Sequence, residues 1–218
     1  MIGQTKQGFF ITLEGGEGSG KSTQIKRLDT RLRLAGHAVK VTREPGGSPG
    51  AEAIRELLIN GDIDRWDGMA EALLNFAARC DHVRHTIRPA LNDGKVVISD
   101  RFADSTMAYQ GYGHGLGRDV IERLYATTLG DFKPDLTLIL NLPAEEGLLR
   151  ANSRGGNRFE DMDIAFHQRL HDGFLEIANE DKIRCRLIDA TGTEETVEAS
   201  VWSIVGQALK DAGLEQNV

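Results

Sequence analysis

A glycine-rich segment near the start of the sequence has the residue types and the spacing of a phosphate-binding loop. Glycines let the backbone turn tightly enough for successive N–H groups to point at phosphate oxygens, Lys21 adds a positive charge, and the Ser22 hydroxyl can ligate Mg²⁺. A glycine-rich turn without a ligand is the alternative, but it predicts neither the Lys-Ser pair nor the apolar run 9–13 before the loop. The residues expected to hold the phosphates are Gly15, Gly16, Glu17, Gly18, Ser19, Gly20, Lys21 and Ser22.

A second segment that suggests phosphate chemistry is the apolar run 96–99, which is followed by Asp100 and Arg101. An acid at the end of a strand can help Ser22 to hold Mg²⁺, which neutralises charge that develops on the phosphates during transfer. The planar donors of Arg101 suit a second phosphate. The alternatives are a helix cap for Asp100 and a surface salt bridge for Arg101. Beside a phosphate-binding loop, the metal and phosphate roles are favoured.

Five short apolar runs alternate with helical patterns and predict the scaffold that positions these residues. Such runs are typical of strands covered by helices on both faces, so we expect a three-layer α/β/α domain with a five-stranded parallel sheet. Ligands of these sheets bind outside the carboxyl ends of the strands, where the unusual residues fall. The strands are expected at 9–13, 38–42, 96–99, 136–142 and 184–189, the helices at 21–35, 51–59, 69–92, 119–129, 144–153, 162–179 and 193–209, and glycine-rich loops at 46–50, 111–117 and 155–156.

The bulk composition narrows the class of protein. The 218 residues are expected to form one domain with a substantial core, and the net charge of -7 argues against a nucleic-acid surface. Two cysteines far apart suggest neither a disulfide framework nor a zinc site, and the six histidines are dispersed. Because no stretch is apolar enough for a signal or a membrane span, we expect a cytoplasmic protein that binds no membrane.

Four motifs occur in the order and spacing seen in bacterial thymidylate kinases. They are the phosphate-binding loop, T-R-E-P-G-G at 42–47, D-R at 100–101 and A-Y-Q-G at 108–111. T-R-E-P-G-G and A-Y-Q-G are far more specific than the loop, which many unrelated nucleotide-binding proteins share. From about residue 9 to its last helix, the chain resembles this family of nucleoside monophosphate kinases. The resemblance implies transfer of the γ-phosphoryl group of ATP to thymidine 5′-monophosphate (dTMP), giving dTDP and ADP on the route to dTTP.

For the sugar and phosphate of dTMP, the resemblance implies roles for three residues. Glu17 is expected to accept a hydrogen bond from the 3′-hydroxyl, and Arg55 and Arg101 are expected to hold the acceptor phosphate. The alternatives are a solvated loop acid and surface charges. For Glu17 this alternative fits poorly, because a carboxylate beside a triphosphate is unfavourable unless a hydroxyl or a cation offsets its charge. Together with Lys21 of the phosphate-binding loop, Arg101 and Glu17 are expected to act in catalysis.

For the thymine base, the resemblance implies a hydrogen bond from Arg79, and Thr106 and Gln110 match positions that bond the pyrimidine edge. A site whose polar groups pair with one base rejects a base with different donors, because its own groups are then left unpaired. The sequence departs from the family at Asn75, where relatives usually carry a Phe that stacks on thymine. The aromatic residue here is Phe76, one position later. We expect Phe76 to stack on the base, and packing of Phe76 in the core is the alternative.

The segment from about 150 to 160 resembles the mobile lid of these kinases. Phosphoryl transfer needs positive charge around the migrating group, and the phosphate-binding loop supplies only Lys21. Arg154 is therefore expected to be the catalytic arginine at the transition state, with Arg150 and Arg158 as neighbours that could substitute for it. The alternative is a basic, solvated loop.

Two other functions are compatible with part of the sequence. A kinase of the same architecture for another base would share the phosphate-binding loop and the D-R pair, but Arg79, Thr106 and Gln110 favour thymine. A nucleotide-dependent switch would not need the second set of arginines, and the N-K-x-D base-reading motif of GTP-binding switches is missing. The resemblance also implies a homodimer, to which the helix predicted at 69–92 could contribute an interface.

Overall fold

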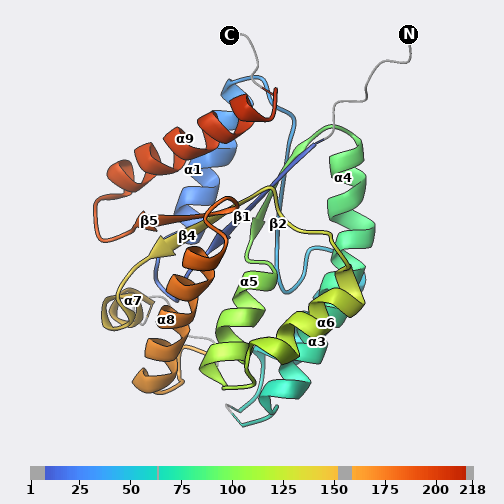
Figure 1. The fold of residues 1–218 in the computed structure, drawn as a ribbon, viewed down its shortest axis with the longest axis vertical. Helices are drawn as coiled ribbons and strands as arrows, with labels where there is room; N and C mark the ends of the chain where they lie inside the picture. The colour runs from blue at the N-terminus through green and yellow to red at the C-terminus, as the bar shows by residue number, and fades with distance from the viewer. Residues whose placement is uncertain (1–7, 63, 152–158, 215–218) are drawn as a thin grey trace.

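The computed structural model describes residues 8–62, 64–151 and 159–214 and contains the predicted parallel sheet (Figure 1). The strands, in the order β2-β3-β1-β4-β5, are all paired in parallel. They are β1 (Phe9–Glu14), β2 (Val39–Arg43), β3 (Val96–Asp100), β4 (Leu136–Asn141) and β5 (Cys185–Asp189). Each predicted strand is confirmed, with ends that differ by one residue or less.

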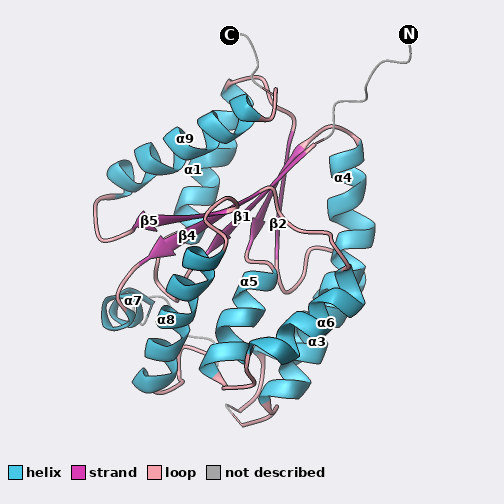
Figure 2. Ribbon diagram, viewed as in Figure 1, coloured by secondary structure: helices cyan, strands magenta, loops and turns pink. Residues whose placement is uncertain are grey.

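Helices cover both faces of the sheet (Figure 2). One face carries α1 (Lys21–Leu34) and α9 (Glu194–Asp211), which pack on each other. The other face carries the remaining long helices, namely α3 (Gly68–His82), α6 (Arg118–Leu129) and α8 (Ile164–Glu180). Two shorter helices, α2 (Pro49–Ile59) and α7 (Ala144–Ala151), pack against α3 and α8, respectively. This arrangement confirms the α/β class predicted from the sequence.

The core lies on both sides of the sheet because successive strand residues point to opposite faces. Ile11 and Leu13 of β1 pack in the cluster that α1 and α9 complete, whereas Phe10 packs on the other side against Phe102. The ring centroids of Phe10 and Phe102 lie 5.1 Å apart in an edge-on arrangement. Burial of both faces explains why the central strands β1, β3 and β4 read as nearly continuous apolar runs. The edge strands β2 and β5 are partly exposed and carry polar residues between apolar ones.

The helix predicted at 69–92 is not continuous. After α3, residues Val83–Ile87 form a π-helical turn (η1), and α4 (Arg88–Asn92) follows. The amide of Arg88 donates to the carbonyl oxygen of Val83, five residues earlier. Pro89 has no amide N–H to donate, which interrupts the α-helical pattern at this point.

A short helical region between β3 and α6 was not predicted as a helix. It consists of α5 (Ala103–Thr106) and a π-helical turn, η2 (Met107–Gly113), whereas the sequence predicted a loop from residue 111. Its buried side chains include polar ones, so its hydrophobic pattern is weak. Gly113 permits close contact with α8, since a Cβ there would lie 2.6 Å from the ring of Phe166.

No helix in the described part of the chain is long and apolar enough to cross a membrane.

Candidate active site

The phosphate-binding loop connects β1 to α1 and turns at three glycines in the positive-φ region. Gly15, Gly18 and Gly20 have φ angles of 133°, 65° and 91°, which residues with a side chain rarely adopt. A Cβ on Gly18 would lie 2.0 Å from the carbonyl oxygen of Gly147 in α7. The loop leads directly into α1, whose first N–H groups have no intrahelical partner and are suited to bind phosphate.

The ammonium group of Lys21 lies against the carbonyl oxygens of the loop. Its Nζ donates to the oxygen of Gly16 at 2.8 Å and to that of Gly15 at 3.1 Å. Burial, reinforced by the nearby guanidinium of Arg101, lowers the pKa of Lys21 to about 8. A phosphate in the loop would place negative charge beside this buried cation and favour its protonated form.

Ser22 and Asp100 come together where β1 and β3 end side by side. The Ser22 Oγ donates to Oδ2 of Asp100 at 3.4 Å. A hydroxyl and a carboxylate are the hard oxygen ligands that Mg²⁺ prefers, usually together with water and phosphate oxygens. The pair therefore fits the magnesium role expected from the sequence. No cluster of three His, Cys, Asp or Glu side chains that could hold a metal occurs in the described ranges.

Arg101 follows β3 in a left-handed backbone conformation with a φ angle of 69°. Two hydrogen bonds hold this turn. The amide of Arg101 donates to the carbonyl oxygen of Leu13 at 3.0 Å, and the amide of Phe102 donates to Oε1 of Glu14 at 2.7 Å. Such a conformation costs about 1–3 kcal/mol and persists only where its surroundings fix it. The turn directs the side chain to the phosphate-binding loop, where Nη1 donates to the oxygen of Gly15 at 2.9 Å.

Glu17 is held between Arg101 and Tyr109. Its Oε1 accepts hydrogen bonds from the Tyr109 hydroxyl at 2.6 Å and from Nη2 of Arg101 at 3.1 Å. Burial raises the pKa of Glu17, but Arg101, Lys21 and the Tyr109 hydrogen bond outweigh it, so the pKa lies below its usual value. Glu17 is thus an ionised hydrogen-bond acceptor at the junction of the loop and the neighbouring cavity.

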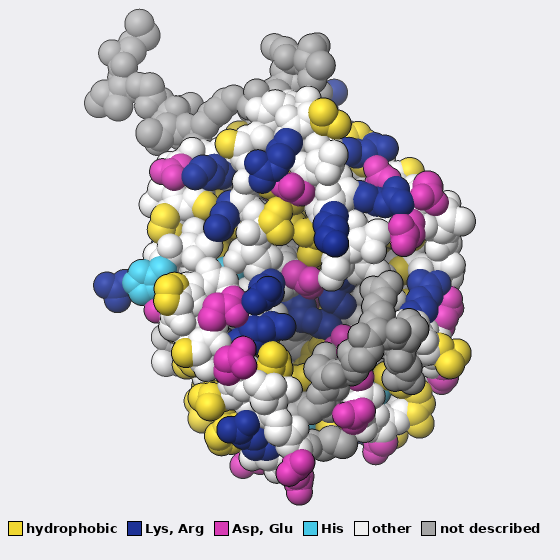
Figure 3. Space-filling view, turned by 180° about the vertical axis from the view of Figure 1, so that it is seen from behind, with side chains coloured by type: hydrophobic (Ala, Val, Ile, Leu, Met, Phe, Trp, Pro, Cys, Tyr) yellow, Lys and Arg dark blue, Asp and Glu magenta, His cyan; other side chains and the backbone are white. Residues whose placement is uncertain are grey.

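One cavity beside the phosphate-binding loop collects most of the predicted substrate residues. Figure 3 shows Lys and Arg side chains around a hollow on the face opposite to that of Figure 1. Residues of the cavity wall come from the loop, from α2, α3, α5 and η2, and from the turn after β3. The predicted substrate residues among them are Glu17, Arg55, Arg79, Arg101, Thr106 and Gln110.

Arg79 is buried but has one nitrogen without a partner. Its Nε donates to Oε2 of Glu44 at 2.7 Å, and its Nη2 donates to Oγ1 of Thr106 at 3.0 Å and to the carbonyl oxygen of Phe102 at 3.1 Å. Nη1 has no hydrogen-bond partner among the described residues. Leaving a buried donor unpaired costs about 1–3 kcal/mol. Because Arg79 lines the cavity, this nitrogen indicates a ligand with an acceptor atom.

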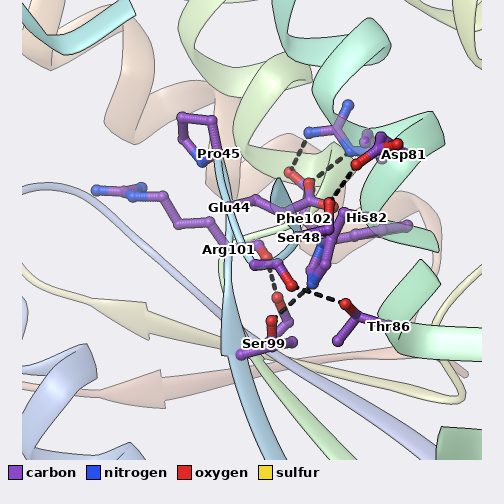
Figure 4. Close-up of polar contacts among 12 residues, drawn as sticks. Glu44, Pro45, Ser48, Asp81, His82, Thr86, Ser99, Arg101 and Phe102 are labelled. Atoms are coloured by element: carbon purple, nitrogen blue, oxygen red, sulfur yellow. Dashed lines mark hydrogen bonds and ion pairs between the residues drawn. The ribbon is translucent and has the colours of Figure 1, made fainter. Parts of the chain in front are cut away.

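A hydrogen-bonded chain through Glu44 and His82, which Figure 4 labels, fixes the orientation of Arg79. Nδ1 of His82 lies 2.9 Å from Oε1 of Glu44, and Nε2 lies 2.6 Å from Oγ1 of Thr42. A carboxylate only accepts, so a neutral His82 donates from Nδ1 to Glu44 and accepts at Nε2 from Thr42. Glu44 in turn uses its other oxygen for Arg79. These contacts connect T-R-E-P-G-G to α3 and position Arg79, the arginine that the sequence predicted to bind the base.

The structure corrects the prediction for Phe76, which packs in the core instead of lining the cavity. Its side chain is 1% exposed, and its ring meets the edge of Tyr125 with centroids 6.4 Å apart. Asn75, one position earlier, lines the cavity. The helical rotation of about 100° between neighbouring residues places one of them on the cavity side and the other inside. A buried ring with no open face cannot stack on a base.

The proposed lid is described only in part. Arg154 and Arg158 lie outside the described residues, and their predicted roles remain predictions. Arg150 is at the end of α7, where its Nη2 donates to Oε1 of Glu146 at 2.6 Å and its Nη1 to the carbonyl oxygen of Ala190 at 3.2 Å. In this arrangement Arg150 donates hydrogen bonds within its own helix, α7, and to the segment that follows β5.

Sequence reasoning assigned no role to three residues that support the site. Glu44 pairs with Arg79, Tyr109 holds Glu17, and Glu71 of α3 accepts from Gln110. Glu44 and Tyr109 lie within the two most specific motifs, which is the signal that could have found them. Glu71 is a charged residue with no exposed surface, and only the fold reveals that it is buried.

The parallel sheet, the glycine loop at the end of β1 and the adjoining arginine-lined cavity define a P-loop kinase with sites for two phosphate-bearing molecules. The family model for thymidylate kinase matches residues 13–201. This chain belongs to the thymidylate kinase family.

Individual relatives agree with this assignment. The chain is 58% identical over 204 residues to the thymidylate kinase of Caulobacter vibrioides, covering 93% of this chain and 98% of that protein. It is 46% identical over 212 residues to the thymidylate kinase of Syntrophotalea carbinolica, covering 94% and 98%. The crystal structure of thymidylate kinase from Ehrlichia chaffeensis superposes with a TM-score of 0.72 at 34% identity, covering 91% of this chain and 99% of that one.

Proposed function

We propose that the cavity beside the phosphate-binding loop binds dTMP and that the loop binds ATP, so that the γ-phosphoryl group passes from one to the other. Family membership makes the protein a kinase that converts dTMP and ATP to dTDP and ADP, a step toward dTTP. The observation that carries the assignment of this cavity is the unpartnered Nη1 of Arg79. Thymine presents O4 as an acceptor for such a donor.

On the ATP side, the loop amides and Lys21 would hold the β- and γ-phosphates. The charge of Lys21 would stabilise the negative charge shared by the transferring group and the leaving oxygens. Ser22 and Asp100 would hold Mg²⁺. When bound, that ion supplies charge neutralisation on the phosphates and an anchor for their orientation.

On the dTMP side, Arg55 and Arg101 would hold the acceptor phosphate and Glu17 the sugar. Nη1 of Arg55 donates to the carbonyl oxygen of Pro45 at 2.7 Å, which leaves its other donors for a ligand. Arg101 contacts Gly15, at the start of the phosphate-binding loop, and also Glu17, the loop residue assigned to the sugar of dTMP. One side chain would thus connect the two half-sites. Catalysis then rests mainly on positioning and electrostatics, because a phosphate oxygen is already a competent nucleophile.

The lid, the homodimer and the cytoplasmic location belong to the same proposal. The lid and the homodimer rest on the family resemblance, and the cytoplasmic location is the expectation drawn from the composition of the sequence. Arg154 would approach the migrating phosphoryl group and add positive charge to the single ammonium of Lys21. Closure of the segment at about 150–160 would exclude water, whose attack on ATP competes with transfer.

A coupled assay that detects ADP, run with ATP, Mg²⁺ and a panel of nucleoside monophosphates, tests the proposal. We expect phosphorylation of dTMP to dominate. Arg79→Met should raise the KM for dTMP strongly and leave the KM for ATP near its original value. Arg84→Met is the matched control, because Arg84 is an exposed arginine of the adjoining η1 turn. An unchanged KM for dTMP in Arg79→Met would contradict the assignment of this cavity to dTMP.

A further inference from the structure

Gln110 reaches the cavity from η2 with one end of its amide already engaged. Its Nε2 donates to Oε2 of Glu71 at 2.8 Å, an oxygen that also lies 3.2 Å from Nε2 of His114. Gln110 is 2% exposed and Glu71 is 0% exposed. Gln110 lines the cavity that also contains Arg79.

The chemistry of Glu71 fixes which end of the Gln110 amide faces the ligand. A carboxylate can only accept hydrogen bonds, so it must face the NH₂ group of the amide and not its oxygen. No described residue donates to Oε1 of Gln110. With Nε2 turned to Glu71, Oε1 is the acceptor that the amide can offer to a ligand in the cavity.

The polarity of the cavity wall is therefore set at two positions. Arg79 offers a donor, Nη1, and cannot accept. Gln110 offers an acceptor, Oε1. The Watson–Crick edge of thymine presents O4 as an acceptor and N3–H as a donor, which complements this pair. Cytosine presents an amino group, a donor that would face the donor Nη1 of Arg79. Its unprotonated N3 is an acceptor that would face the acceptor Oε1 of Gln110.

We propose that Glu71 is a specificity-determining positioning residue, which holds the Gln110 amide in the orientation that accepts N3–H of thymine and repels N3 of cytosine. The inference rests on the proposed binding of dTMP in this cavity. Glu71 does not line the cavity itself and acts through Gln110. An amide free to turn could donate to N3 of cytosine, and one of the two mismatches would then vanish.

The test compares dTMP with 5-methyl-dCMP, because the two nucleotides differ only at the edge in question. Glu71→Gln keeps the shape but allows either end of the Gln110 amide to face position 71. We expect the ratio of kcat/KM for dTMP to that for 5-methyl-dCMP to fall by roughly ten-fold or more, as one unpaired buried polar contact is relieved. Glu71→Asp, whose carboxylate is one methylene further from Gln110, should lower the ratio similarly.

A rescue variant separates positioning from general damage. The double variant combines Glu71→Gln with Gln110→Glu, so that position 110 carries a carboxylate and position 71 an amide. That carboxylate accepts from the new amide and can only accept from the base, so preference for dTMP should return. Glu176→Gln is the control, since Glu176 accepts from the hydroxyl of Tyr112 in the same turn, at 2.7 Å, and should leave the ratio unchanged.

The possible failures are distinguishable. If the unaltered protein did not phosphorylate dTMP, the proposed function would be wrong. If it did, and if both Glu71 variants kept the original ratio while folding with an unaltered melting temperature, the inference about Glu71 alone would be overturned. A lowered ratio that the double variant fails to restore would also count against positioning through Gln110.

Discussion

Oε2 of Glu44 accepts a hydrogen bond from Nε of Arg79 at 2.7 Å, in an ion pair whose side chains are 4% and 1% exposed, respectively. Removing one partner of a buried pair leaves an uncompensated charge. We therefore expect Glu44→Gln to lower the free energy of unfolding by about 3–5 kcal/mol, as measured by urea denaturation. Glu52→Gln, which removes an exposed partner of Arg43, should cost less than about 1 kcal/mol. Equal losses in the two variants would contradict the importance of burial.

Phe76→Ala tests whether the ring belongs to the core. Deleting a buried Phe typically costs about 3–5 kcal/mol, so the melting temperature should fall clearly. The KM for dTMP, measured well below that temperature, should remain close to its original value. Asn75→Ala should show the reverse pattern, with little loss of stability and an altered KM. A large rise in KM in Phe76→Ala alone would restore the stacking role.

ATP binding should be coupled to proton uptake through Lys21. With a pKa of about 8 in the free protein, Lys21 is about half protonated at pH 8, and the phosphates should raise its pKa by adding negative charge. ATP affinity should therefore fall as the pH rises through 8. Calorimetry at pH 8 in buffers of different ionisation enthalpy measures the protons taken up. Lys21→Arg, which stays charged, should take up none, and buffer-independent heats in the unaltered protein would refute the coupling.

Glu14 should make folding stability depend on pH. Burial, followed by the nearby Asp104, raises the pKa of Glu14 from 4.5 to about 8. Between those values the folded protein keeps a proton that the unfolded chain has lost, so this group lowers the stability as the pH rises. Urea denaturation at several pH values should show that Glu14→Gln, which mimics the protonated form, weakens this decline. If the free energy of unfolding changed with pH in the same way in the unaltered protein and in Glu14→Gln, this role of Glu14 would be disproved.

Arg154→Ala should lower kcat far more than it raises either KM, because the proposed contact strengthens only in the transition state. Steady-state kinetics with dTMP and ATP measure both constants. Arg150→Ala provides a comparison within the same segment, and we expect a smaller loss of kcat since Arg150 pairs with Glu146. A normal kcat in Arg154→Ala would remove this residue from the catalytic set.

The sequence predicted the structure best where a segment has one clear pattern of residue types. Strands such as β4 are buried almost throughout and mostly apolar because both faces are covered, and the phosphate-binding loop has a characteristic spacing of glycines, Lys21 and Ser22. The helical turns of the region 103–113 were not predicted because they bury two polar residues, Thr106 and Gln110, that line the cavity. Buried polar residues weaken the hydrophobic pattern by which a helix is recognised. A helix whose buried face carries polar side chains is therefore difficult to predict from the local sequence.

The placement of Phe76 failed for a different reason. Neighbouring residues of α3 point in directions about 100° apart, so Asn75 faces the cavity and Phe76 faces the core. The neighbouring motifs do not determine which of the two residues faces the cavity. The pairing of Glu71 with Gln110 joins positions 39 residues apart, so no local pattern could reveal it. The residues predicted to touch ligands were found from motifs, whereas the residues that support them required the fold.

The hydrogen bond from the amide of Arg101 to the carbonyl oxygen of Leu13 joins the turn after β3 to the end of the adjacent strand β1. Strands in one sheet lie about 4.8 Å apart, so under the proposed binding mode the backbone, rather than adjustable side chains, would set the spacing between the donor and acceptor nucleotides. The proposed base recognition, by contrast, depends on residues of α3 and η2. Natural or laboratory evolution could thus retune which nucleobase is accepted while the reaction trajectory stays untouched.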